Sequence, residues 1–465
     1  MDVIAAISTA NALSAIGIVR VSGEGCFNIC NKVFQPAKGG LFSAARPREM
    51  VLGHLLDREN RAIDSCLAVR FPGPGSYTGE DCAEFHCHGS PVVLHEALTS
   101  LFAAGARQAG RGEFTKRAFL NGRMDLTQAE AVIDLIESET VQAAHNAVEQ
   151  LGGALRRRIE PVYDSLLNIA SQFYAVVDYP DEDIEDLTRE EILQTLTQAE
   201  TTLQTLLATA GRGQILRQGV PTAILGRPNV GKSSLLNALV GYDRAIVTDI
   251  AGTTRDTVEE KANLGGVLLR LIDTAGIRDT GDAVERLGVE RSRAAVERAE
   301  LILVVVDSVE AEHLTEAGGR ELLEILRLVM DTGKPWIWID SKCDLSGAGA
   351  CSVGAVRGSS PAATVCLSAV TGTGMDKLEK AVAALFPEDT DAQAGALLTN
   401  ARQAEAANRA RSAVERGAEA LKAGLSPDAV VADVEEAMSA LGELTGRTVR
   451  EDVTARIFER FCVGK

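Results

Sequence analysis

The residues GRPNVGKS, Gly226–Ser233, decide the fold of this chain. They fit the phosphate-loop pattern G-x-x-x-x-G-K-[ST] at every fixed position. The apolar run Thr222–Leu225 before the loop predicts a buried strand, and Leu235–Val240 after it predicts a helix that ends at Gly241. A glycine-rich turn can match the pattern by chance, but a strand and a helix on either side favour a nucleotide site.

The loop carries the groups that a nucleoside triphosphate needs. Its glycines let backbone N–H groups turn toward phosphate oxygens, Lys232 places a charge at the β- and γ-phosphates, and the Ser233 hydroxyl suits Mg²⁺. Lys232 is therefore a catalytic as well as a binding candidate. The nucleotide contacts expected from this segment are Asn229, Val230, Gly231, Lys232, Ser233 and Ser234.

A second phosphate-facing motif lies downstream. The predicted strand Leu268–Ile272 delivers Asp273-Thr274-Ala275-Gly276, a D-x-x-G arrangement in which the carboxylate reaches Mg²⁺ through water and the glycine N–H meets the γ-phosphate. Between the two motifs, Gly252, Thr253 and Thr254 supply groups for the γ-phosphate and the metal, with Thr254 as the second Mg²⁺ candidate. Together they predict a GTPase-type phosphoryl-transfer site.

Base recognition is expected after the strand Pro335–Ile339. GTPases usually carry N-K-x-D there, and this chain has Ser341, Lys342, Cys343 and Asp344. Asp344 can accept both N1–H and N2–H of guanine, which adenine does not offer. The serine removes one amide contact, so guanine specificity is predicted to be kept and affinity weakened. After the strand Thr364–Leu367, the pair Ser368-Ala369 fits the loop that backs guanine O6.

The residue after D-x-x-G is Ile277, where Ras-like proteins place a glutamine that orients the attacking water. Isoleucine has no hydrogen-bonding group in its side chain. Another group must therefore position the water, and something must offset the charge of the transition state. The nearby arginines Arg227 and Arg255 are candidates for that charge.

The length, net charge and cysteine content of the chain restrict the kinds of partner and compartment that it can have. A length of 465 residues suggests roughly three domains. The net charge of −18 argues against non-specific adhesion to nucleic acid or anionic membranes, so RNA must use a local basic patch such as Arg156–Arg158 or a partner protein. Nine irregularly spaced cysteines do not resemble a disulfide framework. Without a signal peptide or an apolar run of membrane-spanning length, we expect a cytoplasmic protein with no membrane contact.

The first 120 residues or so predict mixed α/β structure, with strands at Ile16–Val21 and Leu67–Phe71. The segment Asp81–Gly89 is rich in cysteine and histidine, which invites a zinc hypothesis. Neighbouring residues on a strand point to opposite faces, so ordinary strand residues are the favoured interpretation.

From Met124 to about Ala210 the pattern becomes helical, with a capping box at Thr188 and Glu191, and helical sequence resumes from Leu397 to Phe461. The predicted fold is an N-terminal α/β domain, an α-helical domain, and a Ras-like doubly wound GTPase domain inserted in the helical one. Two separate helical bundles are the alternative. The expected domains are residues 1–121, a discontinuous helical domain of 122–218 and 388–465, and the GTPase domain of 219–387.

Five segments outside the nucleotide motifs carry a family resemblance. They are Gly17–Gly23, Ser76–Asp81, Gly112–Gly122, Leu126–Ala131 and Phe461–Lys465. Together with the GTPase motifs, and in this order, they resemble the bacterial MnmE family of tRNA-modification GTPases over essentially the whole chain.

The resemblance implies a homodimer whose N-terminal domain binds a 5-formyl-tetrahydrofolate-type molecule. It also implies a FAD-containing partner, MnmG, in a heterotetramer that adds a carboxymethylaminomethyl-type group at C5 of the wobble uridine of certain tRNAs. By position, the folate site involves Arg20, Glu84, Arg123 and Lys465. Taken without the resemblance, Arg20 and Glu84 are more simply surface charges on strands.

The resemblance also supplies the missing catalytic parts. It implies activation by K⁺ and by pairing of GTPase domains, with K⁺ held by Asn229, Thr248, Ile250 and Thr253. Glu285 would orient the water, although alone it would be read as a helix-surface charge. The nucleotide contacts expected from the loop before Thr253 are Thr248, Asp249, Ile250 and Ala251. Cys462 matches a near-terminal family cysteine, whose role is either chemical or local packing.

Two functions of other classes stay open on sequence grounds. One is a GTP-dependent switch in ribosome assembly, which requires an RNA-binding module that the sequence does not display. The other is an N-terminal half that acts as an independent folate enzyme.

Overall fold

The computed structural model describes residues 2–179, 187–242, 260–272, 293–311, 316–345, 360–387, 396–426, 428–448, 457–459 and 461–464. The chain groups into two compact units. The first contains Met1–Ile136, Gln150–Gln204 and Glu405–Lys465, and the second contains Glu137–Glu149 and Thr205–Ala404.

The first unit contains a seven-stranded sheet in the order β3-β4-β5-β6-β2-β1-β7. Its neighbours pair antiparallel except β1 and β7, which are parallel. The strands are β1 (Ile4–Ile7), β2 (Ser14–Ser22), β3 (Phe34–Pro36), β4 (Val51–Leu56), β5 (Ala62–Phe71), β6 (Cys82–Gly89) and β7 (Arg107–Gln108). The strands predicted around residues 16–21 and 67–71 are thus confirmed as parts of β2 and β5.

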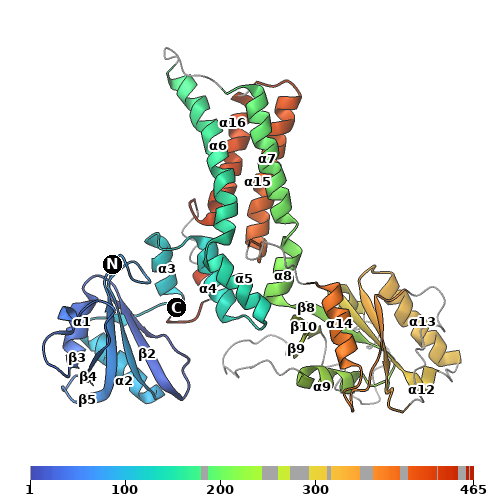
Figure 1. Ribbon diagram of the computed structural model, residues 1–465, viewed down its shortest axis with the longest axis horizontal. Helices are drawn as coiled ribbons and strands as arrows, with labels where there is room; N and C mark the ends of the chain where they lie inside the picture. The colour runs from blue at the N-terminus through green and yellow to red at the C-terminus, as the bar shows by residue number, and fades with distance from the viewer. Residues whose placement is uncertain are drawn as a thin grey trace. The chain divides into compact units, whose positions relative to one another are not determined.

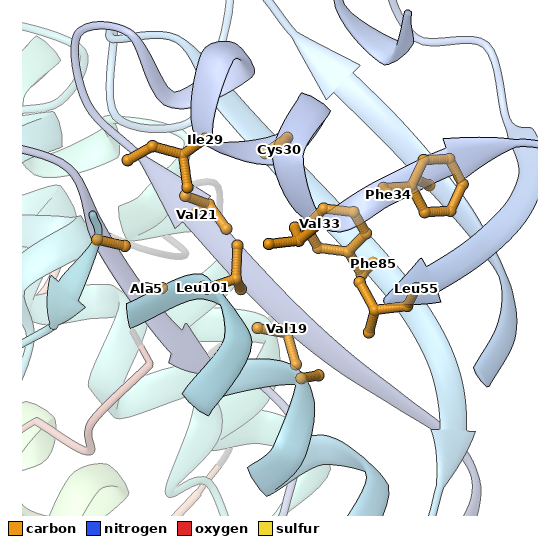
Figure 2. Packing of buried hydrophobic residues seen from close by; sticks show 14 of the residues in the cluster. Ala5, Val19, Val21, Ile29, Cys30, Val33, Phe34, Leu55, Phe85 and Leu101 are labelled. Carbon is orange, nitrogen blue, oxygen red and sulfur yellow. The ribbon is translucent and has the colours of Figure 1, made fainter. Parts of the chain in front are cut away.

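One face of this sheet is covered by α1 (Cys26–Val33) and α2 (Pro91–Ala104) (Figure 1). Figure 2 shows Val19 and Val21 of β2 and Phe85 of β6 packed against Ile29 of α1 and Leu101 of α2. Successive strand residues alternate between the two faces, so their neighbours lie on the opposite face, where Ile4 and Ala6 of β1 pack with Phe114.

Away from Phe114, this opposite face carries a mainly apolar row across four strands. Ile18 lies opposite His86, His86 opposite Leu67, and Leu67 opposite Leu52. Leu52 and Leu67 are 54% and 39% exposed, and Ile16 of β2 on the same face is 60% exposed. Exposed apolar side chains gathered in this way are typical of a contact surface.

Long helices complete the first unit, and α6, α7, α15 and α16 run side by side in Figure 1. Tyr174 Oη of α6 donates to Glu435 Oε1 of α16 at 2.8 Å. Gly417 of α15 lies within van der Waals reach of Leu196 of α7 and Val430 of α16. Helices that come before and after the six-stranded sheet in the sequence therefore pack together. The bounds are α3 (Glu113–Leu120), α4 (Leu126–Ile136), α6 (Ala154–Asp178), α7 (Arg189–Leu207), α15 (Ala401–Lys422) and α16 (Asp428–Thr445), with a 3-10 turn at Phe42–Ala44. Helix α5 (Val141–Leu151) falls mostly within the second unit.

The capping box predicted for α7 is present. Glu191 Oε2 accepts a hydrogen bond from the Thr188 backbone N–H at 2.9 Å, and Thr188 Oγ1 accepts one from the Glu191 N–H at 3.3 Å. These reciprocal contacts satisfy N–H groups that have no partner inside the helix.

The last residues of the chain return to the N-terminal sheet. Val463 forms a β-bridge with Arg111, and Ser8 Oγ donates to the Gly464 carbonyl at 2.9 Å. Phe461 packs with Ala129 of α4 in a small apolar cluster. The tail is thereby fixed beside β1 and the start of α3.

The second unit contains a six-stranded sheet in the order β13-β12-β11-β8-β10-β9. All neighbours are parallel except β9 and β10, as expected for a doubly wound sheet with an antiparallel edge strand. The strands are β8 (Val220–Leu225), β9 (Glu260–Leu264), β10 (Val267–Ile272), β11 (Leu301–Asp307), β12 (Trp336–Ser341) and β13 (Ala363–Cys366). The helices are α8 (Ala210–Gln218), α9 (Lys232–Tyr242), α12 (Ser308–Ala311), α13 (Glu316–Met330) and α14 (Met375–Leu385).

Two predicted boundaries in this unit are wrong. Helix α9 passes Gly241 and continues to Tyr242, because a glycine near a helix end lowers helix propensity without forbidding the conformation. Ser341, predicted in a loop, is the last residue of β12 and is 5% exposed, because its pairing with Asp307 extends the strand.

Candidate active site

The phosphate loop joins β8 to α9 at the carboxyl edge of the sheet, where β8 lies between β11 and β10. Gly226 has φ +155, and a Cβ there would approach the Val305 carbonyl oxygen to 2.4 Å. Gly231 has φ +99, a conformation that other residues seldom adopt. The first turn of α9 is closed by the Leu235 N–H bonding to Gly231 O at 2.9 Å. Backbone N–H groups in the first turn of a helix favour phosphate binding.

Lys232 is folded against its own loop. Its Nζ donates to the carbonyl oxygens of Gly226 at 2.8 Å and Arg227 at 2.6 Å. An ammonium group has three protons, so one remains for a phosphate oxygen. Burial lowers the pKa of Lys232 from its ordinary value. A partly desolvated cation held at the start of a helix is an effective electrostatic partner for phosphate.

The loop is tied to the strand that precedes the base-recognition residues. Ser341 Oγ donates to Val230 O at 2.5 Å and lies 3.1 Å from Val306 O. Lys342 Nζ donates to Asn229 O at 2.9 Å and to Asp307 Oδ2 at 2.7 Å.

The two loops expected to hold guanine end neighbouring parallel strands. Asp344, after β12, is exposed, whereas Ser368, after β13, is 1% exposed. The Cys343 N–H bonds to the Leu367 carbonyl at 3.4 Å, which links the two segments. Ala369 follows Ser368 and is half-buried. The exposed carboxylate and the adjoining turn form one edge on which a base can rest.

Arg227 is engaged by a residue of α13. Its Nε donates to Glu321 Oε2 of α13 at 2.9 Å, and a Cβ on Gly318 would lie 2.8 Å from its guanidinium carbon. The contact with α13 agrees with an outward-pointing side chain.

Several predicted site residues lie outside the described residues. These are Thr248, Asp249, Ile250, Ala251, Gly252, Thr253, Thr254, Arg255, Asp273, Thr274, Ala275, Gly276, Ile277, Glu285 and Lys465. Described members of the nucleotide set are Asn229, Val230, Gly231, Lys232, Ser233, Ser234, Ser341, Lys342, Asp344, Ser368 and Ala369. All of the latter lie at the carboxyl edge of the second unit's sheet.

In the first unit, Arg20 and Glu84 are partners. They lie opposite each other on β2 and β6, and Arg20 Nη2 is 2.9 Å from Glu84 Oε1. The Arg20 guanidinium also lies over the rings of Tyr77 at 5.2 Å and Phe114 at 5.7 Å. The side chains of Arg20 and Glu84 are only 21% and 16% exposed, so they are not simple surface charges. Arg123, the third predicted folate residue, is exposed.

Arg123 lies near the segment that follows Tyr77. A Cβ on Gly79 would touch the Arg123 stem at 3.2 Å, and Asn121 Nδ2 donates to Thr78 O at 2.8 Å. The Thr78 hydroxyl in turn contacts Ser22 Oγ at 2.7 Å at the end of β2.

The cysteine- and histidine-rich segment forms strand β6. Cys82 and Cys87 are buried in or beside the sheet core, whereas His86 contacts Glu84 at 3.3 Å and His88 contacts Asp64 at 2.8 Å. Across the described ranges, no three His, Cys, Asp or Glu residues are grouped so that they could hold a metal ion.

The arginine run in α6 is largely engaged by neighbours. Arg156 pairs with Glu160 at 3.1 Å, and Arg157 donates to Gly152 O. Arg447 also bonds Glu160 at 2.7 Å and stacks over Tyr163 at 4.5 Å. Arg156 and Arg447 share the single carboxylate of Glu160, so this ion pair neutralises only part of the positive charge that the sequence assigned to an RNA patch.

Sequence reasoning gave no role to Asp307, Tyr77 or Phe114. Asp307 ends the otherwise apolar strand β11 and is buried, and a lone carboxylate at the carboxyl end of a parallel strand was the available signal. The rings over Arg20 come from separate segments, so nothing local pointed to them.

Within the described part of the chain, no helix combines the length and apolar character needed to cross a bilayer.

Two family models match the chain. One is described as the MnmE helical domain and matches residues 126–462, and the other is described as the GTP-binding protein TrmE N-terminus and matches residues 3–123. Among curated relatives, a tRNA modification GTPase MnmE of Roseiflexus castenholzii is 44% identical over 100% of this chain and 99% of the relative. The protein of the same name from Alkaliphilus metalliredigens is 42% identical, with the same coverage.

Solved structures show weaker likeness. A GTP-binding protein of Sulfolobus solfataricus in complex with GDP has a TM-score of 0.28 and 17% identity, covering 48% of this chain and 66% of that one. This likeness carries no argument about function.

Proposed function

Because the chain belongs to the MnmE family of tRNA-modification GTPases, we propose that it hydrolyses GTP while it modifies tRNA in the cytoplasm. It acts with the FAD-containing MnmG in a heterotetramer to add a carboxymethylaminomethyl-type group at C5 of the wobble uridine. The observation that carries the proposal is the full-length match, joined to the phosphate loop, Lys232 and base-recognition edge on one sheet.

Several of the described residues have proposed roles in GTP binding and hydrolysis. N–H groups of Val230 and Gly231 and the Lys232 ammonium bind the phosphates, while Asp344 accepts guanine N–H groups. Mg²⁺ fits at the Ser233 hydroxyl in the first turn of α9, with Thr254 as the second proposed ligand. When bound, the metal neutralises charge on the β- and γ-phosphates.

We propose that K⁺ supplies the positive charge that an arginine provides in other GTPases. Asn229 suits this role because its side chain is exposed and its residue lies in the loop itself, at φ 61. The remaining ligands proposed are Thr248, Ile250 and Thr253, and Glu285 is proposed to orient the attacking water. Because Arg227 is paired with Glu321, a cation other than this arginine is favoured as the source of the positive charge.

We propose that the folate site lies around Arg20 and Glu84. A bound folate would exchange their mutual contact for its own groups, with Arg20 facing a glutamyl carboxylate and Glu84 a pterin N–H edge. Tyr77 and Phe114 bound this region with aromatic rings. Arg123 and Lys465 complete the proposed set, and the docking of Gly464 on Ser8 supports a tail close to the N-terminal sheet.

The exposed row on the opposite face of that sheet supports a homodimer. Its row from Ile18 to Leu52 leaves apolar side chains exposed, and a second copy of the chain would bury them. We also propose three domains, with a GTPase domain (219–387) inserted in a helical domain (122–218 and 388–465) that follows a folate domain (1–121). Packing of α6 and α7 with α15 and α16 supports this insertion.

The test is genetic complementation with chemical readout. Cells that lack the gene receive the parental chain or Lys232→Ala, and nucleosides from their tRNA are analysed by mass spectrometry. We expect the parental chain to restore the modified wobble uridine and the variant to leave it absent. Unmodified uridine with the parental chain, together with accumulated ribosome precursors in the deletion strain, would refute the proposal in favour of an assembly switch.

A further inference from the structure

Two consecutive residues at the end of β12 hold two consecutive carbonyl groups of the phosphate loop. Ser341 Oγ donates to Val230 O at 2.5 Å, and Lys342 Nζ donates to Asn229 O at 2.9 Å. We call this pair of contacts the loop clamp. It joins the segment that precedes Asp344 to the segment that binds phosphate.

The Ser341 side chain is directed at the loop. Its residue is 5% exposed, and its Oγ lies 3.6 Å from the position of a Cβ on Gly231. Both oxygens within its reach are backbone carbonyls, those of Val230 and Val306. A hydroxyl has a single proton, so it donates to one of them at a time, and Val230 is the nearer.

Backbone geometry connects the clamp to phosphate binding. In a planar trans peptide the C=O and N–H groups point in opposite directions. Fixing Asn229 O and Val230 O toward β12 therefore fixes the N–H groups of Val230 and Gly231 away from it, on the inner side of the loop. These are N–H groups that a phosphate loop turns toward phosphate oxygens.

The conformation being held is an uncommon one. Asn229 has φ 61 and Lys342 has φ 56, both in the left-handed region that non-glycine residues seldom occupy. Such residues persist where surrounding contacts determine them. The Lys342 ammonium is itself anchored by the buried carboxylate Asp307 at 2.7 Å, which keeps the lysine in place.

We propose that Ser341 is a positioning residue for the phosphate loop rather than a base contact. The serine, which stands where GTPases usually carry asparagine, retains a donor for the loop carbonyl and aims the loop N–H groups. This inference rests on the GTPase activity proposed above. It makes phosphate affinity and turnover depend on a residue of the base-recognition segment.

The test compares Ser341→Ala with two other variants. Ser341→Ala removes only the hydroxyl, and Ser341→Asn supplies an amide donor to the same carbonyl. Thr222→Val is the matched control, because it removes a buried hydroxyl of β8 that donates within its own strand to Val220 O. Thermal unfolding of all four proteins establishes that each is folded.

Steady-state GTP hydrolysis gives the first readout. We expect kcat to fall about tenfold in Ser341→Ala, since losing a hydrogen bond to a buried carbonyl disturbs the groups that bind the reacting phosphates. Ser341→Asn should restore at least half of the parental kcat, and Thr222→Val should match the parent. An unchanged kcat in Ser341→Ala would overturn the inference.

Inorganic tripolyphosphate, which has no base, gives the second readout as a competitor of labelled GDP. If the loop clamp positions the phosphate loop, Ser341→Ala should weaken the binding of tripolyphosphate and of GDP by the same factor. If tripolyphosphate competes with GDP equally well in Ser341→Ala and in the parental chain, the proposed role of Ser341 is overturned. If the parental chain binds GDP without hydrolysing GTP, the proposed function fails, while this binding comparison still decides the role of Ser341.

Discussion

Lys232→Ala offers the sharpest test of the nucleotide site. The ammonium has two donors on the carbonyls of Gly226 and Arg227, at 2.8 and 2.6 Å, and one available for phosphate. Losing a charged hydrogen bond in a partly buried site costs about 3 kcal/mol at the upper end. We therefore expect kcat/KM for GTP to fall by up to about 150-fold, since each 1.4 kcal/mol is a factor of ten.

The fold should tolerate this change. The carbonyls of Gly226 and Arg227 belong to half-buried residues, which water can reach. Burial lowers the pKa of Lys232, so placing the charged amine there has a folding cost that alanine removes. The expected loss of stability is below about 1 kcal/mol, a shift of a few degrees in Tm.

The assay is phosphate release from GTP at saturating Mg²⁺ and K⁺, with circular dichroism melts on the same samples. Lys380→Ala is the matched control, because Lys380 is an exposed lysine of α14 in the same unit. It should retain parental kinetics. Parental turnover in Lys232→Ala, or equal losses in both variants, would refute the assignment of this lysine to the phosphates.

Three further outcomes are expected. K⁺ should stimulate hydrolysis well above Na⁺ at equal ionic strength, and Asn229→Ala should remove most of that stimulation; equal rates in the two salts with full activity in the variant would redirect attention to Arg255. The parental chain should prefer GTP to ATP, and Asp344→Ala should abolish the preference; comparable parental hydrolysis of both nucleotides would show that specificity has been lost. Burial alone would raise the pKa of Glu113, but hydrogen bonds from Arg107 and the Gly110 N–H hold it at about 2. Because this value lies below the ordinary 4.5, the ionised carboxylate contributes stability that is present above pH 4.5 and is lost as pH falls toward 2. Hydrogen exchange of α3 amides at pH 6 and pH 3 should show this loss in the parent and a much smaller one in Glu113→Gln.

For the core of the second unit, the local sequence pattern was sufficient to predict the strands and the phosphate loop. The strands around 222–225 and 268–272 are apolar runs with turn signals at their ends, and the phosphate loop between β8 and α9 is specified by its own eight residues. The capping box at Thr188 is equally local, since its partners are three residues apart. In such cases neighbours in sequence carry the interaction, so the sequence predicts it.

Contacts between distant segments were decided by tertiary structure. From the sequence alone, Ser341 was interpreted as the loss of an amide contact to guanine. In the structure its hydroxyl donates to a carbonyl 111 positions away, because β12 and β8 end at one edge of the sheet. Without the family resemblance, Arg20 was interpreted as a surface charge. In the structure, antiparallel pairing places it opposite Glu84, and folding brings Tyr77 and Phe114 beside it. Sequence periodicity specifies which face a side chain occupies. Which side chain meets it there depends on strand order, and that is fixed by packing of the whole sheet.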